Sequence, residues 1–537
     1  MLQDLANLAD GTHIETDLCV VGAGAAGITL SRALAGSSLN VCLLESGGFD
    51  HDAWISNLGA GENLGQEYYT LEDSRLRFFG GTTNIWGGRC VPLDAEDFEK
   101  RSWVPHSGWP IGRDDLAEGY RRAHTDLELG PQLNEGAFWQ RVGSAQPEPL
   151  REDFVTSFWY FDQQPERFSA SRCADLFAAP NIRVITHASV THLQARPNAS
   201  GLKHLVIQAP GGKRATVGAR AFVLAAGAIE NSRLLLMSRD VESCGIGNRH
   251  DQVGRYFMEH PHGRLGRIDA QDAYSIWKAY EKRYPPGSVP LAPVLRPSRA
   301  LQEREGILNT AVTFKLQRDP ASGQAFTRRA YQTLKHELSP TRSNRLLWHA
   351  YNRLRRVYQR HRGPLMRLAA RRGDRHVYAM IRAEQAPNPD SRVILSQQTD
   401  AFGNPRADLH WQLNGQDKHT LRVLADALNR SLQTRSLGAF SRAPWVDDPG
   451  PAWPVDPTVG NHPIGGYHHM GTTRMASSPS TGVTDGNCQV FGYSNLFVAG
   501  SSVFATAGWA NPTLTIVALA HRLGAHLQSR VPDLPVS

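Results

Sequence analysis

A glycine-rich turn near the N-terminus limits the fold of this chain more than any other feature of its sequence. The apolar run at residues 16–21 is typical of a buried parallel strand, and Gly22-Ala-Gly-Ala-Ala-Gly27 follows it directly. A helical pattern of apolar residues then extends to Leu34, and a second apolar run at 40–44 ends at Glu45. This order of strand, glycine turn, helix, strand and acid predicts a Rossmann-like α/β unit that binds a dinucleotide.

Each residue type in this pattern has a physical role in holding a dinucleotide. Gly22 permits the tight turn, Gly24 lets the backbone approach a pyrophosphate, and Gly27 lets the helix pack close to the strand. Unpaired amides at the helix N-terminus favour phosphate. Glu45 is expected to accept hydrogen bonds from a ribose diol, and its charge disfavours NADP. The motif leaves FAD and NAD as alternatives.

The size and composition of the chain predict an ordinary globular protein. Its 537 residues are 41% hydrophobic and 20% charged, which favours two connected domains over disorder. Residues 1–10 hold no basic run before an apolar stretch, and no apolar run approaches the roughly 18 residues that span a bilayer. Six cysteines without a paired spacing favour reduced thiols, with Cys19 and Cys42 as small buried residues. We therefore expect a cytoplasmic protein without a signal peptide, a transmembrane segment or a disulfide framework.

The basic charge of the chain is concentrated in one segment. Residues 342–375 contain eleven arginines and a single acid, so this segment carries +10 while the whole chain carries +7 and the remainder −3. Its apolar residues follow a helical spacing, which predicts one or two amphipathic helices ending near Gly363-Pro364. A surface insertion that covers a site or a subunit contact is one interpretation, and an anionic membrane surface or an acidic partner is another. Nothing in the chain resembles a nucleic-acid-binding module, so we expect no nucleic-acid partner.

Further motifs extend the pattern beyond the N-terminal unit. A second glycine-rich stretch, Phe78 to Cys90, suggests backbone lying against a flat ligand. Apolar, strand-like runs at 221–227 and 495–500 both end on glycine, and a helical pattern follows the first at 228–236. Together with His468-His-Met-Gly471 and Ala510-Asn-Pro-Thr513, these segments resemble the glucose-methanol-choline (GMC) oxidoreductase family, and most of all its pyranose-oxidase-like and bacterial sugar and glycoside oxidoreductases.

The resemblance implies an α/β fold made of two domains. An FAD-binding domain would be assembled from residues 14–104, 181–260 and 455–537. A substrate-binding α+β domain with a large, mostly antiparallel sheet would comprise 105–180 and 261–454, with the arginine-rich insertion at about 342–375. Within the second domain, 387–395 and 408–411 are predicted to form a turn and strands of that sheet.

The resemblance also assigns cofactor-binding residues. Gly22, Gly24, Gly27 and Glu45 would bind the ADP half of FAD, and Val190 would contact adenine through its backbone. The remaining implied positions lie by the flavin ring or close the site from the C-terminal side, namely Thr83, Asn84, Gly500, Ser501, Asn511 and Thr513. Relatives that tether FAD covalently use a histidine where this chain has Ile85, so we predict non-covalent FAD. Ser501 and Ser502 stand where many relatives have an acid, and a serine hydroxyl can still donate a hydrogen bond there.

Oxidation of an alcohol needs a group that removes the hydroxyl proton, and a histidine suits that task because its pKa lies near neutral pH. The resemblance makes His468 this general base and Asn511 its partner at the substrate oxygen. Adjacent residues of an extended segment point in opposite directions, so His469 is expected to be structural. No Cys or acid completes a familiar metal-binding spacing around His260, His262 and His462, and we predict no metal.

The sequence therefore predicts FAD-dependent oxidation of a CH–OH group of a sugar or glycoside to a carbonyl. The proton would pass to His468 and the hydride to flavin N5, and oxygen or another acceptor would take the electrons. Alternatives are a non-sugar alcohol substrate of sterol, aryl or choline-like type, a dehydrogenase subunit that docks to an electron-transfer partner, and an NAD-dependent dehydrogenase. The sequence is compatible with a homo-oligomer.

Overall fold

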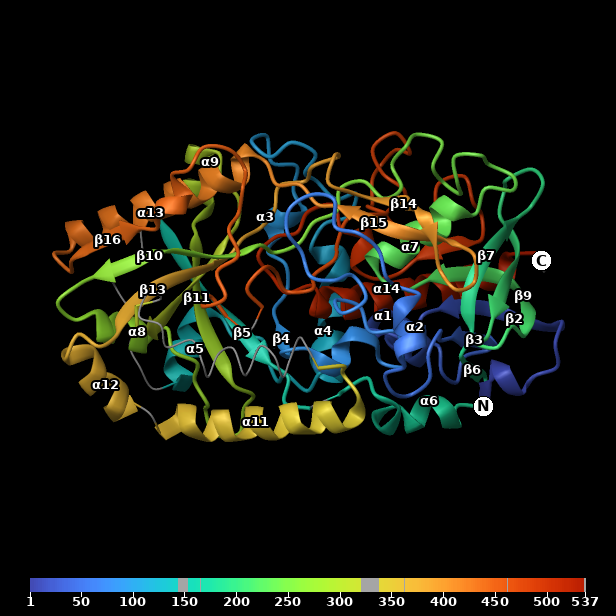
Figure 1. Cartoon of the computed structure of the whole chain (residues 1–537), viewed down its shortest axis with the longest axis horizontal. Coiled ribbons are helices and arrows are strands. Elements are labelled where there is room, and N and C mark those ends of the chain that lie inside the picture. The colour runs from blue at the N-terminus through green and yellow to red at the C-terminus, as the bar shows by residue number, and fades with distance from the viewer. Residues whose placement is uncertain (143–152, 165, 320–337, 362, 461, 536–537) are drawn as a thin grey trace.

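The two apolar runs that flank the first glycine turn form neighbouring parallel strands at the centre of one sheet. A computed structural model of the protein describes residues 1–142, 153–164, 166–319, 338–361, 363–460 and 462–535. It is an elongated molecule with one large sheet towards each end and both termini at the same end (Figure 1). The N-terminal motif belongs to the sheet near the termini.

The first sheet has eight strands and combines parallel with antiparallel pairs. The neighbouring pairs β1–β6, β6–β3, β3–β2, β2–β9 and β9–β17 are parallel. The pairs β9–β8 and β8–β7, at one edge of the sheet, are antiparallel. In spatial order the strands are β1 (Leu2–Asp4), β6 (Ile182–Thr186), β3 (Val41–Leu44), β2 (Thr12–Val21), β9 (Arg214–Leu224), β8 (Leu202–Gln208) and β7 (Ser189–Ala195), with β17 (Leu496–Val498) also paired to β9.

Helices that follow the glycine-ended strands pack on this sheet. Helix α1 (Ala25–Ala33) follows β2 and lies against α14 (Thr513–Arg530), which in turn packs on α4 (Ala117–Asp126). Helix α7 (Ala228–Met237) follows β9. Every residue of β3 is buried, as a strand covered on both faces requires. Cys19 and Cys42 are buried, as predicted, and lie opposite one another on β2 and β3, and all six cysteines are free.

The second sheet has seven strands, and all its neighbouring pairs are antiparallel. The mixed eight-stranded sheet with its helices and the large antiparallel sheet together confirm the fold class predicted from the sequence. In spatial order the strands are β16 (Ala439–Arg442), β10 (His262–Asp269), β13 (His376–Arg382), β12 (Ala311–Gln317), β11 (Leu291–Pro297), β5 (Phe154–Phe161) and β4 (Arg89–Cys90).

The strands predicted near 393 and 408 form, but they are not part of the large antiparallel sheet, and that prediction was wrong. Strands β14 (Arg392–Thr399) and β15 (Pro405–His410) make a separate two-stranded sheet that packs on α7. Loop backbone satisfies their outer edges, because Val393 N–H donates to the Gly254 carbonyl and Leu409 N–H donates to the Glu62 carbonyl. The outer edges are therefore not available to the larger sheet.

The arginine-rich segment folds as the predicted amphipathic helix, and a second helix follows it. Helix α11 (Arg342–His361) runs along one side of the molecule, below the seven-stranded sheet and the middle of the molecule in Figure 1, and α12 (Gly363–Arg371) lies beyond it at the end away from the termini. The N-terminal end of α11 is anchored by Arg345, which is 4% exposed and forms ion pairs with Asp50 and Glu166. The long helix α13 (Gly415–Thr434) packs on β16 and β10.

Shorter helices complete the described part of the chain. They are α2 (Ala53–Asn57), α3 (Ala95–Phe98), α5 (Glu135–Val142), α6 (Ala174–Ala178), α8 (Ala273–Ala279) and α9 (Arg299–Glu305). Within the ranges given above, none of the helices combines the length and the apolar character that crossing a bilayer would require.

Candidate active site

One cavity of about 800 Å³ runs from the glycine turn after β2 to the face of the seven-stranded sheet. Elements far apart in the sequence enclose it, including the turn after β2, the loop before β4, the start of α14 and the inner side of α11. Of the residues predicted to bind a cofactor or to act in catalysis, those that line it are Gly22, Gly24, Glu45, Thr83, Val190, His468, Gly500, Ser501, Asn511 and Thr513.

The three glycines of the first turn differ in what surrounds them. Gly22 has a φ of +103°, and a Cβ there would lie 2.7 Å from the Ala225 carbonyl oxygen. A Cβ on Gly27 would lie 2.0 Å from the Gly22 carbonyl oxygen, so only glycine lets α1 approach this closely. A Cβ on Gly24 would meet nothing within 4 Å, although Gly24 lines the cavity. The protein leaves this space open at the N-terminus of α1, where a phosphate is favoured.

Glu45 stands at the end of β3 with its carboxylate fixed by backbone donors. The Ala23 N–H and the Gly47 N–H each donate to it at 3.0 Å. Burial raises the pKa of Glu45, and these hydrogen bonds oppose the shift. The carboxylate is therefore held in one orientation towards the cavity, as recognition of a ribose diol requires.

Thr83 and Asn84 were both predicted to lie by the flavin ring, but only Thr83 lines the cavity. Asn84 is 2% exposed, and its amide donates to the Phe79 carbonyl at 3.1 Å and to the Gly81 carbonyl at 2.9 Å. Asn84 thus holds the shape of the glycine-rich loop from behind. Ile85 lines the cavity from the same loop.

His468 and Asn511 meet at the wall of the same cavity. The Asn511 amide nitrogen lies 3.1 Å from His468 Nε2, and His468 Nδ1 lies 2.8 Å from His260 Nδ1. His260 Nε2 lies 2.8 Å from the Gly508 carbonyl oxygen. A carbonyl only accepts, so His260 carries its proton on Nε2 and its Nδ1 accepts from His468 Nδ1–H. In neutral His468 the lone pair is therefore on Nε2, the nitrogen that faces Asn511.

The environment keeps both rings of this pair neutral. Burial lowers the pKa of His260 to about 4. Burial also lowers the pKa of His468 well below its ordinary value, a proton on His260 or His262 would lower it further, and the charges of Arg382 and Arg89 act in the same direction. At neutral pH, His468 is an unprotonated base.

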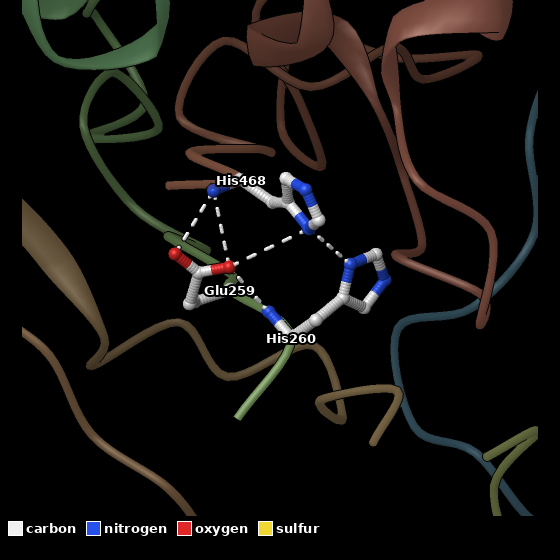
Figure 2. Close-up of side chains that lie close together, drawn as sticks. All are labelled: Glu259, His260 and His468. Carbon is white, nitrogen blue, oxygen red and sulfur yellow. Dashed lines mark hydrogen bonds and ion pairs between the residues drawn. The ribbon is translucent and has the colours of Figure 1, made fainter. Parts of the chain in front are cut away.

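Glu259 fixes the chain around both histidines (Figure 2). Its carboxylate accepts from the His468 N–H at 2.9 Å, from the His260 N–H at 2.7 Å and from the Gly466 N–H at 3.1 Å. The Tyr68 hydroxyl donates to it at 2.6 Å. Burial raises the pKa of Glu259, and these donors counteract the shift. Its Oε1 lies 3.8 Å from His468 Nδ1, close enough to stabilise a protonated imidazole.

His469 points to a different partner from its neighbour. Its Nε2 lies 2.9 Å from the Tyr68 hydroxyl, whose own proton goes to Glu259, so His469 Nε2 donates. Burial lowers the pKa of His469 to about 3. The structure thus gives His469 a place in the hydrogen-bonded support behind His468.

Glu259, His260 and His468 are near enough to suggest a metal site, since one ligand atom from each lies within 4.8 Å of the others. The two histidine Nδ1 atoms, however, are 2.8 Å apart. Two nitrogen ligands of a tetrahedral zinc would be roughly 3.3 Å apart. We therefore interpret the cluster as a hydrogen-bonded relay between protein groups.

Sequence reasoning missed two of these residues. It considered His260 only as a possible metal ligand and did not consider Glu259. Neither has a local motif, because each acquires its role from contacts with a loop that lies about 200 residues further along the chain. It also left open whether the arginine-rich segment reaches the site, and the structure shows that Trp348, Arg355 and Arg356 of α11 line the cavity.

Comparisons with known proteins agree with this geometry. Residues 387–520 match a family model described as GMC oxidoreductase, and residues 17–245 match one described as FAD dependent oxidoreductase. A 2-methyl-1,2-propanediol dehydrogenase from Mycolicibacterium austroafricanum is 23% identical over 97% of this chain and 96% of its own. A C-glycoside 3-oxidase from Microbacterium trichothecenolyticum is 32% identical over 26% of this chain and 25% of its own.

Solved structures share the fold. The crystal structure of pyridoxine 4-oxidase from Mesorbium loti aligns with a TM-score of 0.52 and 17% sequence identity, and the alignment covers 95% of this chain and 98% of that one. The alignment thus extends over almost the whole of both chains, and the two proteins share their overall fold.

Proposed function

The chain belongs to the GMC oxidoreductase family, as an FAD-dependent enzyme that acts on alcohol groups, and we propose that it oxidises a CH–OH group of a sugar or glycoside to a carbonyl. The observation that carries the proposal is the His468–Asn511 pair, which faces the same cavity as the dinucleotide cradle of Gly24 and Glu45. The similarity to a C-glycoside 3-oxidase supports the choice of substrate class.

The residues at the N-terminal end of the cavity fit the ADP half of FAD. Gly24 leaves the space that a pyrophosphate needs, and the carboxylate of Glu45 is oriented for a ribose. Val190 on β7 also lines the cavity, and we propose that its backbone contacts adenine. Thr83 and Ser501 line the same cavity as this cradle and His468, and we propose that they lie beside the flavin ring.

The protein's own groups supply the proton chemistry. FAD, when bound, supplies the acceptor for the hydride that leaves the alcohol carbon. His468 Nε2 takes the hydroxyl proton, since Nδ1 already carries a proton and the lone pair is on Nε2, beside Asn511. Asn511 donates to the same oxygen and stabilises negative charge as it develops there. Glu259 stabilises the imidazolium that results.

The absence of a tethering side chain supports non-covalent FAD. Ile85 stands at the position that carries the attachment histidine in some relatives, and an isoleucine side chain has no group that bonds to the flavin. Denaturation of the purified protein is expected to release all of its yellow colour into the filtrate. Colour retained on the polypeptide would contradict this proposal.

The base assignment is tested with the variant His468→Ala. It should retain FAD yet reduce it at least about a hundredfold more slowly when mixed anaerobically with substrate, since general bases contribute about 10² to 10⁴ in rate. The exposed His419 on α13 provides the control variant His419→Ala, which should behave like the wild type. A panel of sugars, glycosides and simple alcohols in the same assay tests the substrate class. Reduction of the flavin by non-sugar alcohols alone would refute that part of the proposal.

A further inference from the structure

The part of the cavity nearest the seven-stranded sheet contains a group of positively charged side chains, which we call the cationic cluster. Its members are Arg89, Lys282, Arg355, Arg356 and Arg382. They come from β4, the segment after α8, α11 and the end of β13, so no single run of basic sequence contains all of them. The fold brings these charges together in the cavity that also holds His468.

Aromatic faces hold the innermost of these cations in place. Lys282 Nζ lies 3.2 Å from the centre of the Phe161 ring, and the Arg382 guanidinium carbon lies 5.2 Å from the centre of a Trp159 ring. Arg89 lies 5.6 Å from both ring systems. Such contacts orient a cation but leave its charge in place.

Acidic groups near the cluster are already engaged elsewhere. Glu281 pairs with Lys278 at 2.7 Å, and the Asp162 carboxylate accepts from Arg167 at 2.6 Å and 2.7 Å. In the part of the chain that the structure describes, neither Lys282 nor Arg382 forms an ion pair with an acid. Burial lowers the pKa of Lys282 well below its ordinary value, and the charges of Arg89, Arg356 and Arg355 lower it further, so the protonated form of Lys282 would be favoured by an anion bound beside it.

The cluster and the proposed base belong to one site. Arg382 on β13 lies directly opposite His262 on β10. His262 is two residues after His260 in the chain. The charges of Arg382 and Arg89 also act on His468, where they contribute to its lowered pKa after burial. A substrate that presents a hydroxyl to His468 would therefore have the cationic cluster beside it.

We propose, building on the proposed function, that the substrate is an anionic alcohol: a sugar or glycoside that carries a carboxylate, sulfate or phosphate group, bound by Lys282 and Arg382. An anionic oxygen group accepts the charge-assisted hydrogen bonds that these two side chains can donate. The faces of Trp159 and Phe161 offer apolar area on which a sugar ring can pack. In this proposal, the cavity selects its substrate because the negative charge of the substrate complements the positive charges of Lys282 and Arg382.

The first test compares matched substrates on the FAD-loaded enzyme. Glucose, glucuronate and glucose 6-phosphate are mixed anaerobically with wild type, Lys282→Met, Arg382→Met and the surface control Lys203→Met, and flavin bleaching is followed. In the wild type and in Lys203→Met, an anionic sugar should show an apparent Kd at least about tenfold lower than glucose. In the two cluster variants that preference should fall by about tenfold, the size of one charge-assisted contact. Equal affinity for glucose and both anions in the wild type would overturn the proposal.

The second test measures anion binding without turnover. Inorganic phosphate and sulfate are titrated into the FAD-loaded enzyme while the flavin absorbance band is recorded. A saturable spectral change that weakens at least about tenfold in Lys282→Met supports the anion site, even if no sugar reduces the flavin and the proposed function fails. Loss of FAD affinity in Lys282→Met with an unchanged preference for anions would mean that the cluster serves the cofactor, and it would overturn the proposal.

Discussion

The tautomer of His468 depends on His260 at Nδ1 and on the Asn511 amide at Nε2, and replacing His260 tests the reasoning most directly. His260 is 1% exposed, donates from Nε2 to the Gly508 carbonyl and accepts at Nδ1 from His468. The variant His260→Leu removes the acceptor and leaves His468 Nδ1–H without a partner. The tautomer with the proton on Nε2 then gains in population, and its Nε2 cannot take a proton from the alcohol.

The size of the effect follows from the cost of one lost buried hydrogen bond. Leaving a buried donor unsatisfied costs about 1 to 3 kcal/mol, which corresponds to a roughly fivefold to 150-fold slower flavin reduction. His260 acts through His468, so we expect the rate of reduction to fall while the apparent Kd of the substrate changes little. The conservative variant His260→Asn keeps an oxygen acceptor near the position of Nδ1 and should restore most of the rate.

Rapid anaerobic mixing measures the rate of flavin reduction and the apparent Kd of the substrate. Nitrogen-15 NMR of histidine-labelled enzyme reports the tautomer of His468 directly. We expect the Nδ1–H form of His468 in the wild type and in His260→Asn, and a shift towards the Nε2–H form in His260→Leu. A purely structural role for His260 would lower stability without moving the tautomer signal. A wild-type His468 protonated on Nε2, or a His260→Leu rate within twofold of the wild type, would refute the reasoning.

Three further predictions concern the cradle, the histidines and α11. Gly24→Ala should fold normally but lose FAD, because its Cβ would occupy the open cavity. Gly27→Ala should unfold at a lower temperature, because its Cβ would lie 2.0 Å from a carbonyl oxygen. The FAD content and the melting curve of each variant check these two expectations. Buried His260 has a pKa of about 4. It is neutral in the folded state and gains a proton near pH 6.5 when unfolded, so stability should fall by about 3 kcal/mol between pH 6.5 and 4 in denaturant titrations. Arg355→Ala should lower kcat/KM because Arg355 lines the cavity, whereas Leu354→Ser, at a position 72% exposed on the same helix, should not.

The N-terminal part of the fold could be predicted because its signals are local. Gly22, Gly24 and Gly27 are close in sequence, and the conformation and spacing of the turn require them. The amphipathic pattern of α11 was equally local, and the helix ends at His361, near the predicted Gly363. Short-range patterns of this kind fix an element's type regardless of what packs on it.

The support of the active site could not be predicted, because it arises from long-range contacts. His260 and Glu259 precede a strand of the antiparallel sheet, and only the pairing of distant segments brings them to His468. The strands β14 and β15 show the same limit. Their sequences indicated strands, but the loop backbone at Glu62 and Gly254 decides that they pair apart from the large sheet.

The position of the base depends on contacts from both sheets. On one side, the Ser501 hydroxyl, which follows β17, donates to the His469 carbonyl at 2.7 Å. On the other side, Glu259, which precedes β10, accepts the His468 N–H.

Behind His260, the Gly508 N–H lies 3.3 Å from the Glu384 carboxylate, which forms a buried ion pair with Arg101. A chain of hydrogen bonds thus links Arg101 on one side of the site to the lone pair of His468 on the other. Loss of the Arg101 charge would leave Glu384 buried and unpaired, and its effect should reach the base through Gly508 and His260. Because Arg101 does not line the cavity, an effect of this change on the nitrogen that takes the proton would be transmitted by this chain of hydrogen bonds.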